Sequence, residues 1–240
     1  MKKEFLVSVI IPAFNEQKNI AICLQSLVDQ QTNYPFEVIV VDNNSTDKTS
    51  EMAYKFKKKL DLKVVNEEKQ GRGIARWRGF NEAKGEILLS LDADTKVPAN
   101  WLDSLVKALD QKKVAAVTTA VKINDCSVLT NTLFNLTQPL VLQLYRVLTG
   151  HLWLNGFSFG IKKEIYQKSG GFNPNLQAQE DLDLGFRVAK LGKIKSIDLV
   201  VIFSGRRFKH GLLTGALPYF KTFFQLYYMK KEDIYLSNPR

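Results

Sequence analysis

Short apolar runs alternate with helical segments through the first half of the chain, and this alternation limits the folds that the chain can adopt. Largely apolar runs fill 7–11, 37–41 and 86–91, and Ile20 and Leu24 stand at helical spacing between the first two. Strands that alternate with helices form a mostly parallel sheet with right-handed crossovers. We therefore predict an α/β fold with a mostly parallel central sheet flanked by helices.

Polar clusters follow three of the predicted strands, at 12–16, 42–47 and 92–95. In open α/β sheets, ligands bind beyond the carboxyl ends of the strands, where these clusters would lie. Any one cluster is explained equally well as a capped turn. Three clusters at one edge of a sheet indicate a binding site.

The third cluster contains two carboxylates, Asp92 and Asp94, on either side of Ala93. Hard divalent cations prefer carboxylate oxygens, and Mg²⁺ keeps few protein ligands because water and substrate phosphate complete its shell. An isolated Asp-x-Asp is more often a simple turn. The apolar strand before it and the turn at Pro98 after it favour a site for Mg²⁺ or Mn²⁺.

Composition narrows the classes of partner. The 240 residues are 45% hydrophobic, which allows one domain with a buried core. Two cysteines, Cys23 and Cys126, are too few for a disulfide framework and fit a reducing compartment. A net charge of +10 suits nucleic acid, anionic lipid or a phosphorylated substrate. We predict no nucleic-acid partner, because the sequence shows neither a nucleic-acid motif nor a basic surface interleaved with aromatic residues.

The tail at 206–240 combines aromatic and basic residues. Leu212 to Met229 is mostly apolar and has basic residues on both sides. Such an amphipathic helical tail suits a membrane interface, to which the apolar stretch from Val128 to Leu148 would add. Packing on the protein's own core, or an oligomer contact, is the alternative.

The expected location is cytoplasmic and peripheral, on the cytoplasmic face of the membrane. No apolar run reaches the length of a transmembrane helix. The opening Met1-Lys2-Lys3 is followed by Glu4 and the turn at Pro12, so these residues fit a strand better than a signal peptide.

Five motifs in order resemble glycosyltransferase family 2, whose members have the GT-A fold. The motifs are Val9 to Glu16, Val41 to Asp47, Gly71 to Gly79, Asp92-Ala93-Asp94, and Gly170-Gly171-Phe172 with Glu180-Asp181. The resemblance implies a Rossmann-like sheet and transfer of a sugar from a nucleoside-diphosphate sugar to an acceptor. It predicts a GT-A domain over 1–205, with a nucleotide-sugar half at 1–95 and an acceptor half at 96–205.

The resemblance also assigns residues to roles. The metal would be held by Asp94 and Asp92, with His210 as a further ligand unless it is a plain surface histidine. The phosphate or the acceptor would be contacted by Glu180, Arg206 and Arg207. An exposed basic loop or a lipid-facing patch explains the two arginines equally well. The nucleotide-sugar would be bound by Pro12, Phe14, Glu16, Asp42, Asn43, Gly71, Arg76, Asp92 and Ala93.

Two positions refine the expected chemistry. Many family members carry Asp where this chain has Asn43, and an amide brings donors as well as an acceptor, so uridine, guanosine and thymidine all stay open. By the resemblance Asp181 is the general base, which takes the proton of an acceptor hydroxyl in a single inverting displacement. Acids at a helix start are favoured by the helix dipole in any case, and we assign only that role to Asp183.

Two other functions are open. A nucleotidyltransferase also uses metal-binding acids on an α/β sheet, but the sequence shows no glycine-rich triphosphate loop near the first strand. A non-catalytic, membrane-associated scaffold would not need Asp92, Asp94 and Asp181. For a transferase, the acceptor would be a glycan or a polyprenyl-phosphate lipid.

Overall fold

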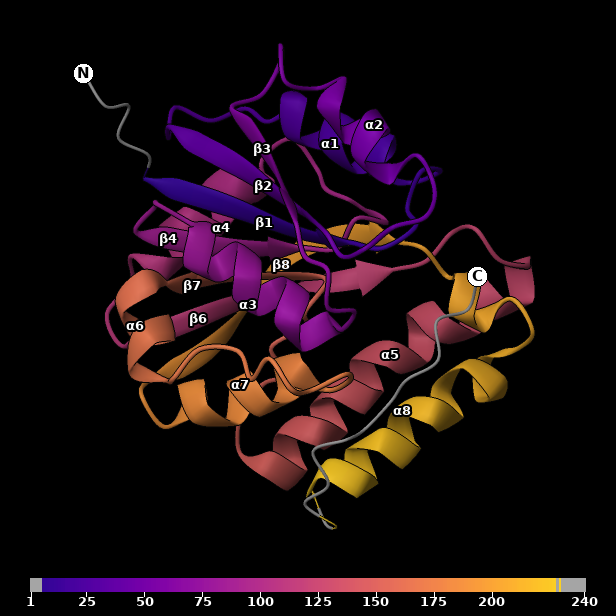
Figure 1. Cartoon of the computed structure of the whole chain (residues 1–240). Coiled ribbons are helices and arrows are strands. Elements are labelled where there is room, and N and C mark those ends of the chain that lie inside the picture. The colour runs from indigo at the N-terminus through magenta and orange to yellow at the C-terminus, as the bar shows by residue number, and fades with distance from the viewer. Residues whose placement is uncertain (1–5, 228, 230–240) are drawn as a thin grey trace.

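The computed structural model describes residues 6–227 and 229. In this part of the chain, eight strands form one sheet in the order β3-β2-β1-β4-β7-β6-β8-β5 (Figure 1). The strands are β1 (Val7–Ala13), β2 (Phe36–Asp42), β3 (Leu62–Asn66), β4 (Ile87–Leu91), β5 (Thr95–Lys96), β6 (Val114–Lys122), β7 (Ser158–Lys162) and β8 (Lys193–Phe203).

Most of the sheet is parallel. β1 pairs in parallel with both β2 and β4, and β2 pairs in parallel with β3. β6 and β8 form a fourth parallel pair. β7 runs antiparallel to both of its neighbours, β4 and β6, and the short β5 is antiparallel to β8. The predicted mostly parallel α/β sheet is confirmed.

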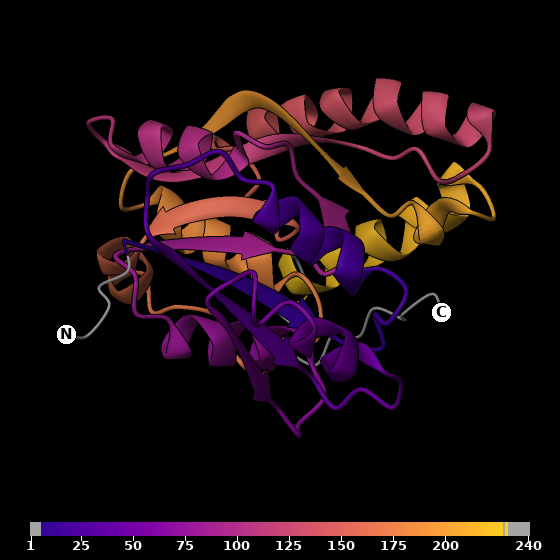
Figure 2. The same ribbon diagram turned by 90° about the horizontal axis from the view of Figure 1, so that it is seen from above.

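Helices cover both faces of this sheet (Figures 1 and 2). Successive strand residues point to opposite faces, so Val9 and Ile11 join one core whereas Ile10 joins the other. The first core contains side chains of α1 (Ile20–Val28), α4 (Trp101–Leu109) and α5 (Val128–Thr149), and the second those of α3 (Arg72–Glu82), α6 (Lys163–Lys168) and α7 (Glu180–Ala189).

The helix α2 (Thr49–Tyr54) is shorter than the sequence suggests. Its apolar spacing predicts a helix as far as Leu60, but after Tyr54 the backbone forms tight turns, with the amide of Lys57 donating to the carbonyl of Tyr54 at 3.1 Å. Such tight turns are common where a helix ends, and here they span a run of lysines whose like charges do not favour a regular helix.

The short helix η1 (Arg206–Phe208) and α8 (Leu212–Tyr227) end the described part of the chain. α8 lies beside α5 and packs against η1 (Figure 1). Residues 228 and 230–240 of the predicted tail, like the opening Met1 to Glu4, lie outside the described residues. Within 6–227, no helix combines the length and the apolar character that crossing a bilayer requires.

Candidate active site

The loops after β1 and β2 are bonded to each other at the carboxyl edge of the sheet. The amide of Asn15 donates to the Ser45 hydroxyl at 2.8 Å, and the Asn15 side-chain oxygen accepts from the amide of Thr46 at 2.7 Å. Asn15 has a φ of 53°, in the left-handed region that asparagine tolerates better than most residues. These bonds hold the loop of Pro12, Phe14 and Glu16 against the loop that follows Asp42.

Two predicted nucleotide-binding residues are engaged in holding their own loops. Asp42 accepts hydrogen bonds from the amide of Ser45 and from a serine hydroxyl, Ser50. The Asn43 amide oxygen accepts from the Gly71 amide at 2.8 Å, and its nitrogen donates to the carbonyls of Lys69 and Glu67 at 2.7 and 3.1 Å. Asn43 therefore fixes the segment that leads into α3.

Arg76 lies at the centre of the site and is buried. Its guanidinium donates to Glu180 at 2.9 Å, to Asp92 at 2.6 Å, to the Ser90 hydroxyl at 2.6 Å and to the Gly156 carbonyl at 3.0 Å. Burial favours the neutral form, but the carboxylates outweigh it and raise the pKa of Arg76, so it stays a cation. All three guanidinium nitrogens of Arg76 therefore donate to groups within the protein.

Asp181 stands at the start of α7, next to Glu180. Its two carboxylate oxygens accept from the amides of Gly156 and Leu182, both at 2.8 Å. Burial, and then the charge of Glu180, raise the pKa of Asp181 to about 6, while Arg76 and the two amides act in the opposite direction. A base with such a pKa is mostly ionised at neutral pH and can still hold a proton.

Asp94 lies on the other side of the site, where Arg206 of η1 reaches it. Arg206 donates to Asp94 at 2.8 Å and pairs with Glu16 through both of its terminal nitrogens. Burial is the main reason that the pKa of Asp94 rises to about 7; Arg206 lowers it, whereas Asp92 and Glu16 raise it. The three predicted residues Glu16, Asp94 and Arg206 thus meet in one cluster.

The carboxylates of Asp92 and Asp94 suit a hard divalent cation that takes few ligands from the protein. Asp92 and Asp94 supply carboxylate oxygens at the end of β4, and Ala93 between them is buried. His210 is exposed, and among residues 6–227 no three acidic, histidine or cysteine side chains form a ready metal cage. The structure therefore brings Asp92 and Asp94 together but does not add His210 to them.

Arg207, the neighbour of Arg206, points to a different group. Its guanidinium carbon lies 5.2 Å from the ring centroid of Tyr219 on α8. Asp183, which follows Asp181 on α7, forms an ion pair with Arg187 one helical turn later, in agreement with a structural role. The three predicted phosphate or acceptor residues thus have different partners: Glu180 binds Arg76, Arg206 binds Glu16 and Asp94, and Arg207 lies over Tyr219.

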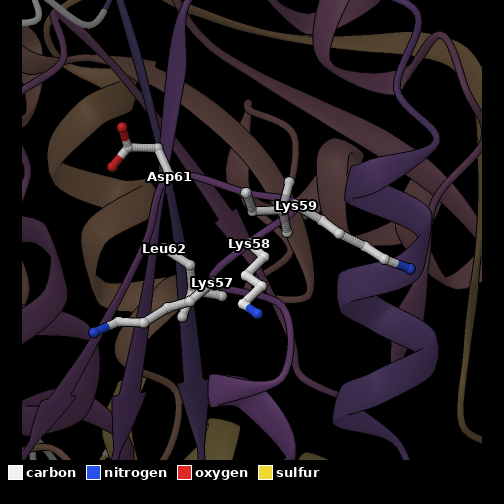
Figure 3. Close-up of a pocket in the computed structure, with 6 residues that line it drawn as sticks. Lys57, Lys58, Lys59, Asp61 and Leu62 are labelled. Atoms are coloured by element: carbon white, nitrogen blue, oxygen red, sulfur yellow. The ribbon is translucent and has the colours of Figure 1, made fainter.

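A shallow surface depression of 460 Å³ lies elsewhere, around Lys57 to Lys59, Asp61 and Leu62 (Figure 3). Its lysine side chains point away from one another, as Figure 3 shows. Leu62 begins β3, so this depression lies at the amino end of the strand. It is therefore not part of the cluster at the carboxyl edge.

Sequence reasoning missed several residues of this site. Ser90 and Gly156 bind Arg76, and Tyr219 packs beside Arg207. A serine inside an apolar strand was a signal for the first of these, because a buried hydroxyl needs a partner. Gly156 and Tyr219 reach the site by tertiary packing, which no local pattern indicates.

The comparison with known proteins identifies the family. The model of glycosyl transferase family 2 matches residues 8–170. The chain therefore belongs to this family, as the motifs predicted. The probable glycosyltransferase YdaM of Bacillus subtilis is 32% identical over 209 residues, which are 80% of this chain and 48% of that protein. The chain spans about half the length of this curated relative.

Solved structures confirm the GT-A fold. Staphylococcus aureus TarS in complex with UDP-GlcNAc matches with a TM-score of 0.65 and 23% identity, over 82% of this chain and 58% of that one. The mannosyltransferase PcManGT of Pyrobaculum calidifontis, in complex with GDP-Man and Mn²⁺, also has a TM-score of 0.65 and 23% identity, over 92% of this chain and 65% of that one. At this identity the likeness establishes the fold alone.

Proposed function

We propose that the chain is a metal-dependent, inverting glycosyltransferase that moves a sugar from a nucleoside-diphosphate sugar to an acceptor. One observation carries this proposal: Arg76 joins Asp92, beside the expected donor site, to the Glu180–Asp181 pair, beside the expected acceptor site. A displacement at a sugar carbon requires carboxylates that hold a cation and a carboxylate that accepts a proton.

Asp181 takes the proton of the acceptor hydroxyl in this mechanism. The amides of Gly156 and Leu182 hold its carboxylate in one orientation. Glu180 is bound to Arg76 and serves to position Asp181 rather than to react. Because one base acts in one displacement, the anomeric centre inverts.

Asp94 and Asp92 would hold a divalent cation, which supplies Lewis-acid neutralisation of the leaving diphosphate. PcManGT was solved with Mn²⁺, which supports a metal of this kind for this chain. Arg206 occupies Asp94 in the structure and must share or leave that carboxylate when a cation binds. Both terminal nitrogens of Arg206 also pair with Glu16, so the guanidinium would keep that partner when a cation takes Asp94.

The nucleotide base is bound by the loops after β1 and β2. UDP-GlcNAc in TarS and GDP-Man in PcManGT show that structural relatives use either base. Asn43 already has backbone partners for its oxygen and its nitrogen, so it cannot act on the base as a free carboxylate would. Uridine, guanosine and thymidine therefore all remain candidates.

The acceptor that we propose is lipid-linked, and the protein acts while bound to the surface of a membrane. Both α5 and α8 expose large apolar side chains, among them Leu136, Leu140 and Leu144 on α5 and Leu217 and Phe224 on α8. Neither helix contains an acidic residue, so an anionic surface meets no repulsion from them. A peripheral place on the cytoplasmic face suits a nucleotide-sugar donor.

The test is a thermal-shift panel of UDP, GDP and dTDP, each with and without Mn²⁺. A true ligand stabilises the folded chain by mass action, so the melting temperature should rise with ligand concentration for one base and rise further with Mn²⁺. Nucleoside triphosphates should stabilise no better than diphosphates. A preference for triphosphates would favour a nucleotidyltransferase, and no shift with any nucleotide would favour a non-catalytic scaffold.

A further inference from the structure

Arg207 lies against Tyr219, the charge of Arg72 acts on both, and the chemistry of Asp94 and Asp181 uses none of the three. Arg207 lies in η1, Arg72 begins α3, and Tyr219 lies midway along α8. The Arg207 guanidinium lies over the Tyr219 ring. Burial lowers the pKa of Arg207; Tyr219 acts in the opposite direction, and the positive charge of Arg72 adds to the lowering because the two cations repel each other.

Packing brings these elements together independently of charge. The amide of Gly73 in the first turn of α3 donates to the carbonyl of Leu176 at 3.0 Å. The same loop continues to Gln179, whose side-chain nitrogen donates to the backbone carbonyl of Tyr219 at 3.2 Å. The start of α3, the loop before α7 and the middle of α8 thus form one continuous wall.

Neither cation of this wall has a carboxylate partner among residues 6–227, although Arg76 and Arg206 each have two. Two guanidinium groups that are not directly paired with a carboxylate leave positive charge at this wall. The charges of Asp181 and Asp92 also act on Tyr219, so the wall lies within electrostatic reach of two of the three carboxylates of the proposed mechanism. An anion bound between the arginines would remove their repulsion.

We propose that Arg72, Arg207 and the Tyr219 hydroxyl form a subsite for a phosphate group. Guanidinium groups bind phosphate oxygens through paired hydrogen bonds, and a phenol hydroxyl adds one more donor. The subsite deepens the proposed function and rests on it. The phosphate has two sources, the diphosphate of the donor or a phosphate on the acceptor, and both offer the same chemistry.

The experiment measures binding to the full chain by calorimetry. The variants are Arg72→Gln, Arg207→Gln and Tyr219→Phe, and the control is Arg78→Gln, which removes an arginine of α3 whose partner is Glu82 on the surface. The donor arm compares UDP and GDP, each with Mn²⁺, with uridine and guanosine. The acceptor arm compares dimethylallyl phosphate with dimethylallyl alcohol. Thermal unfolding of every variant checks that the fold is kept.

We expect each arginine variant to weaken one class of phosphate probe by about tenfold or more, because a hydrogen bond to a charged group is lost. Tyr219→Phe should weaken it less, and the phosphate-free probes and the Arg78 control should be unchanged. Weakened UDP or GDP identifies the donor diphosphate, and weakened dimethylallyl phosphate identifies an acceptor phosphate.

The subsite is refuted if all variants bind both phosphate probes within about twofold of the unaltered chain. It is also refuted if the unaltered chain binds neither probe more tightly than its phosphate-free counterpart. Failure of the proposed function gives a different result. The unaltered chain then binds the phosphate probes and the arginine variants bind them more weakly, but the unaltered chain turns over no nucleotide-sugar.

Discussion

The replacement Arg76→Met tests whether the buried ion pairs of the site hold the fold together. The change keeps a long apolar side chain and removes the guanidinium, so Glu180 is left buried without its counter-ion and the Gly156 carbonyl loses a donor. Removing one partner of a buried pair costs about 3–5 kcal/mol, because the other charge is left uncompensated. The control Arg78→Met breaks a half-exposed pair with Glu82 on the same helix and should cost about 0.3–0.5 kcal/mol.

The cost of Arg76→Met should also depend on pH. Arg76 lowers the pKa of Asp181, so its removal raises that pKa further above about 6 and away from the unfolded value. A carboxyl whose pKa is raised by folding contributes stability at low pH that is lost as the pH rises through the folded-state pKa. The deficit of Arg76→Met should therefore be larger at about pH 8 than at about pH 5.

Urea unfolding of both variants at these two pH values measures the free energies, with the midpoint compared at constant slope. Equal losses for Arg76→Met and Arg78→Met would refute the buried ion-pair argument. A deficit of Arg76→Met that does not grow with pH would refute the coupling of Arg76 to Asp181.

Three further predictions concern metal, pH and membrane. Asp94→Ala should keep the fold and remove the Mn²⁺-dependent part of nucleoside-diphosphate affinity in calorimetry; an unchanged Mn²⁺ dependence would exclude Asp94 as a ligand. The acid limb of kcat/KM should have an apparent pKa of about 6, because Asp181 must be ionised to accept a proton, and a flat profile from about pH 5 to 8 would contradict this. The double change Leu217→Asp and Phe224→Asp should abolish salt-sensitive sedimentation with anionic liposomes, while Ile22→Asp, at an exposed apolar residue of α1, should not. Equal sedimentation of all three proteins would rule out α8 as the membrane contact.

The strands of the first half could be predicted from sequence because their apolar runs end in polar clusters. β1, β2 and β4 are buried on both faces, and such strands show as continuous apolar segments. β7 was not predicted. Its sequence Ser158-Phe159-Gly160-Ile161-Lys162 has no strong strand pattern, and its place is determined by antiparallel pairing with β4 and β6.

The sequence indicates the carboxylates of the candidate site but not the hydrogen bonds that join them to the rest of the chain. Asp92 and Asp94 are visible in one sequence as carboxylates at a strand end, whereas Asp181 is indicated by its place in a motif that resembles the family's. That Arg76 is buried depends on Ser90, 14 positions away, and on Glu180, 104 positions away, so no local spacing indicates it. The link from Arg206 to Glu16 spans 190 positions.

The central claim is that Asp181 is the general base of a nucleotide-sugar transferase, and turnover by Asp181→Asn tests it most directly. The variant keeps the size of the side chain but cannot take a proton from a hydroxyl acceptor. The matched control is Asp183→Asn, on the same helix, where the carboxylate pairs with Arg187. Turnover is measured with a hydroxyl acceptor and a sugar donor that carries the nucleotide selected by the thermal-shift panel, together with donor affinity. The account predicts that kcat falls about 10²–10⁴-fold in Asp181→Asn while donor affinity is preserved and the control stays near normal. Near-normal turnover by Asp181→Asn on the hydroxyl acceptor would contradict it.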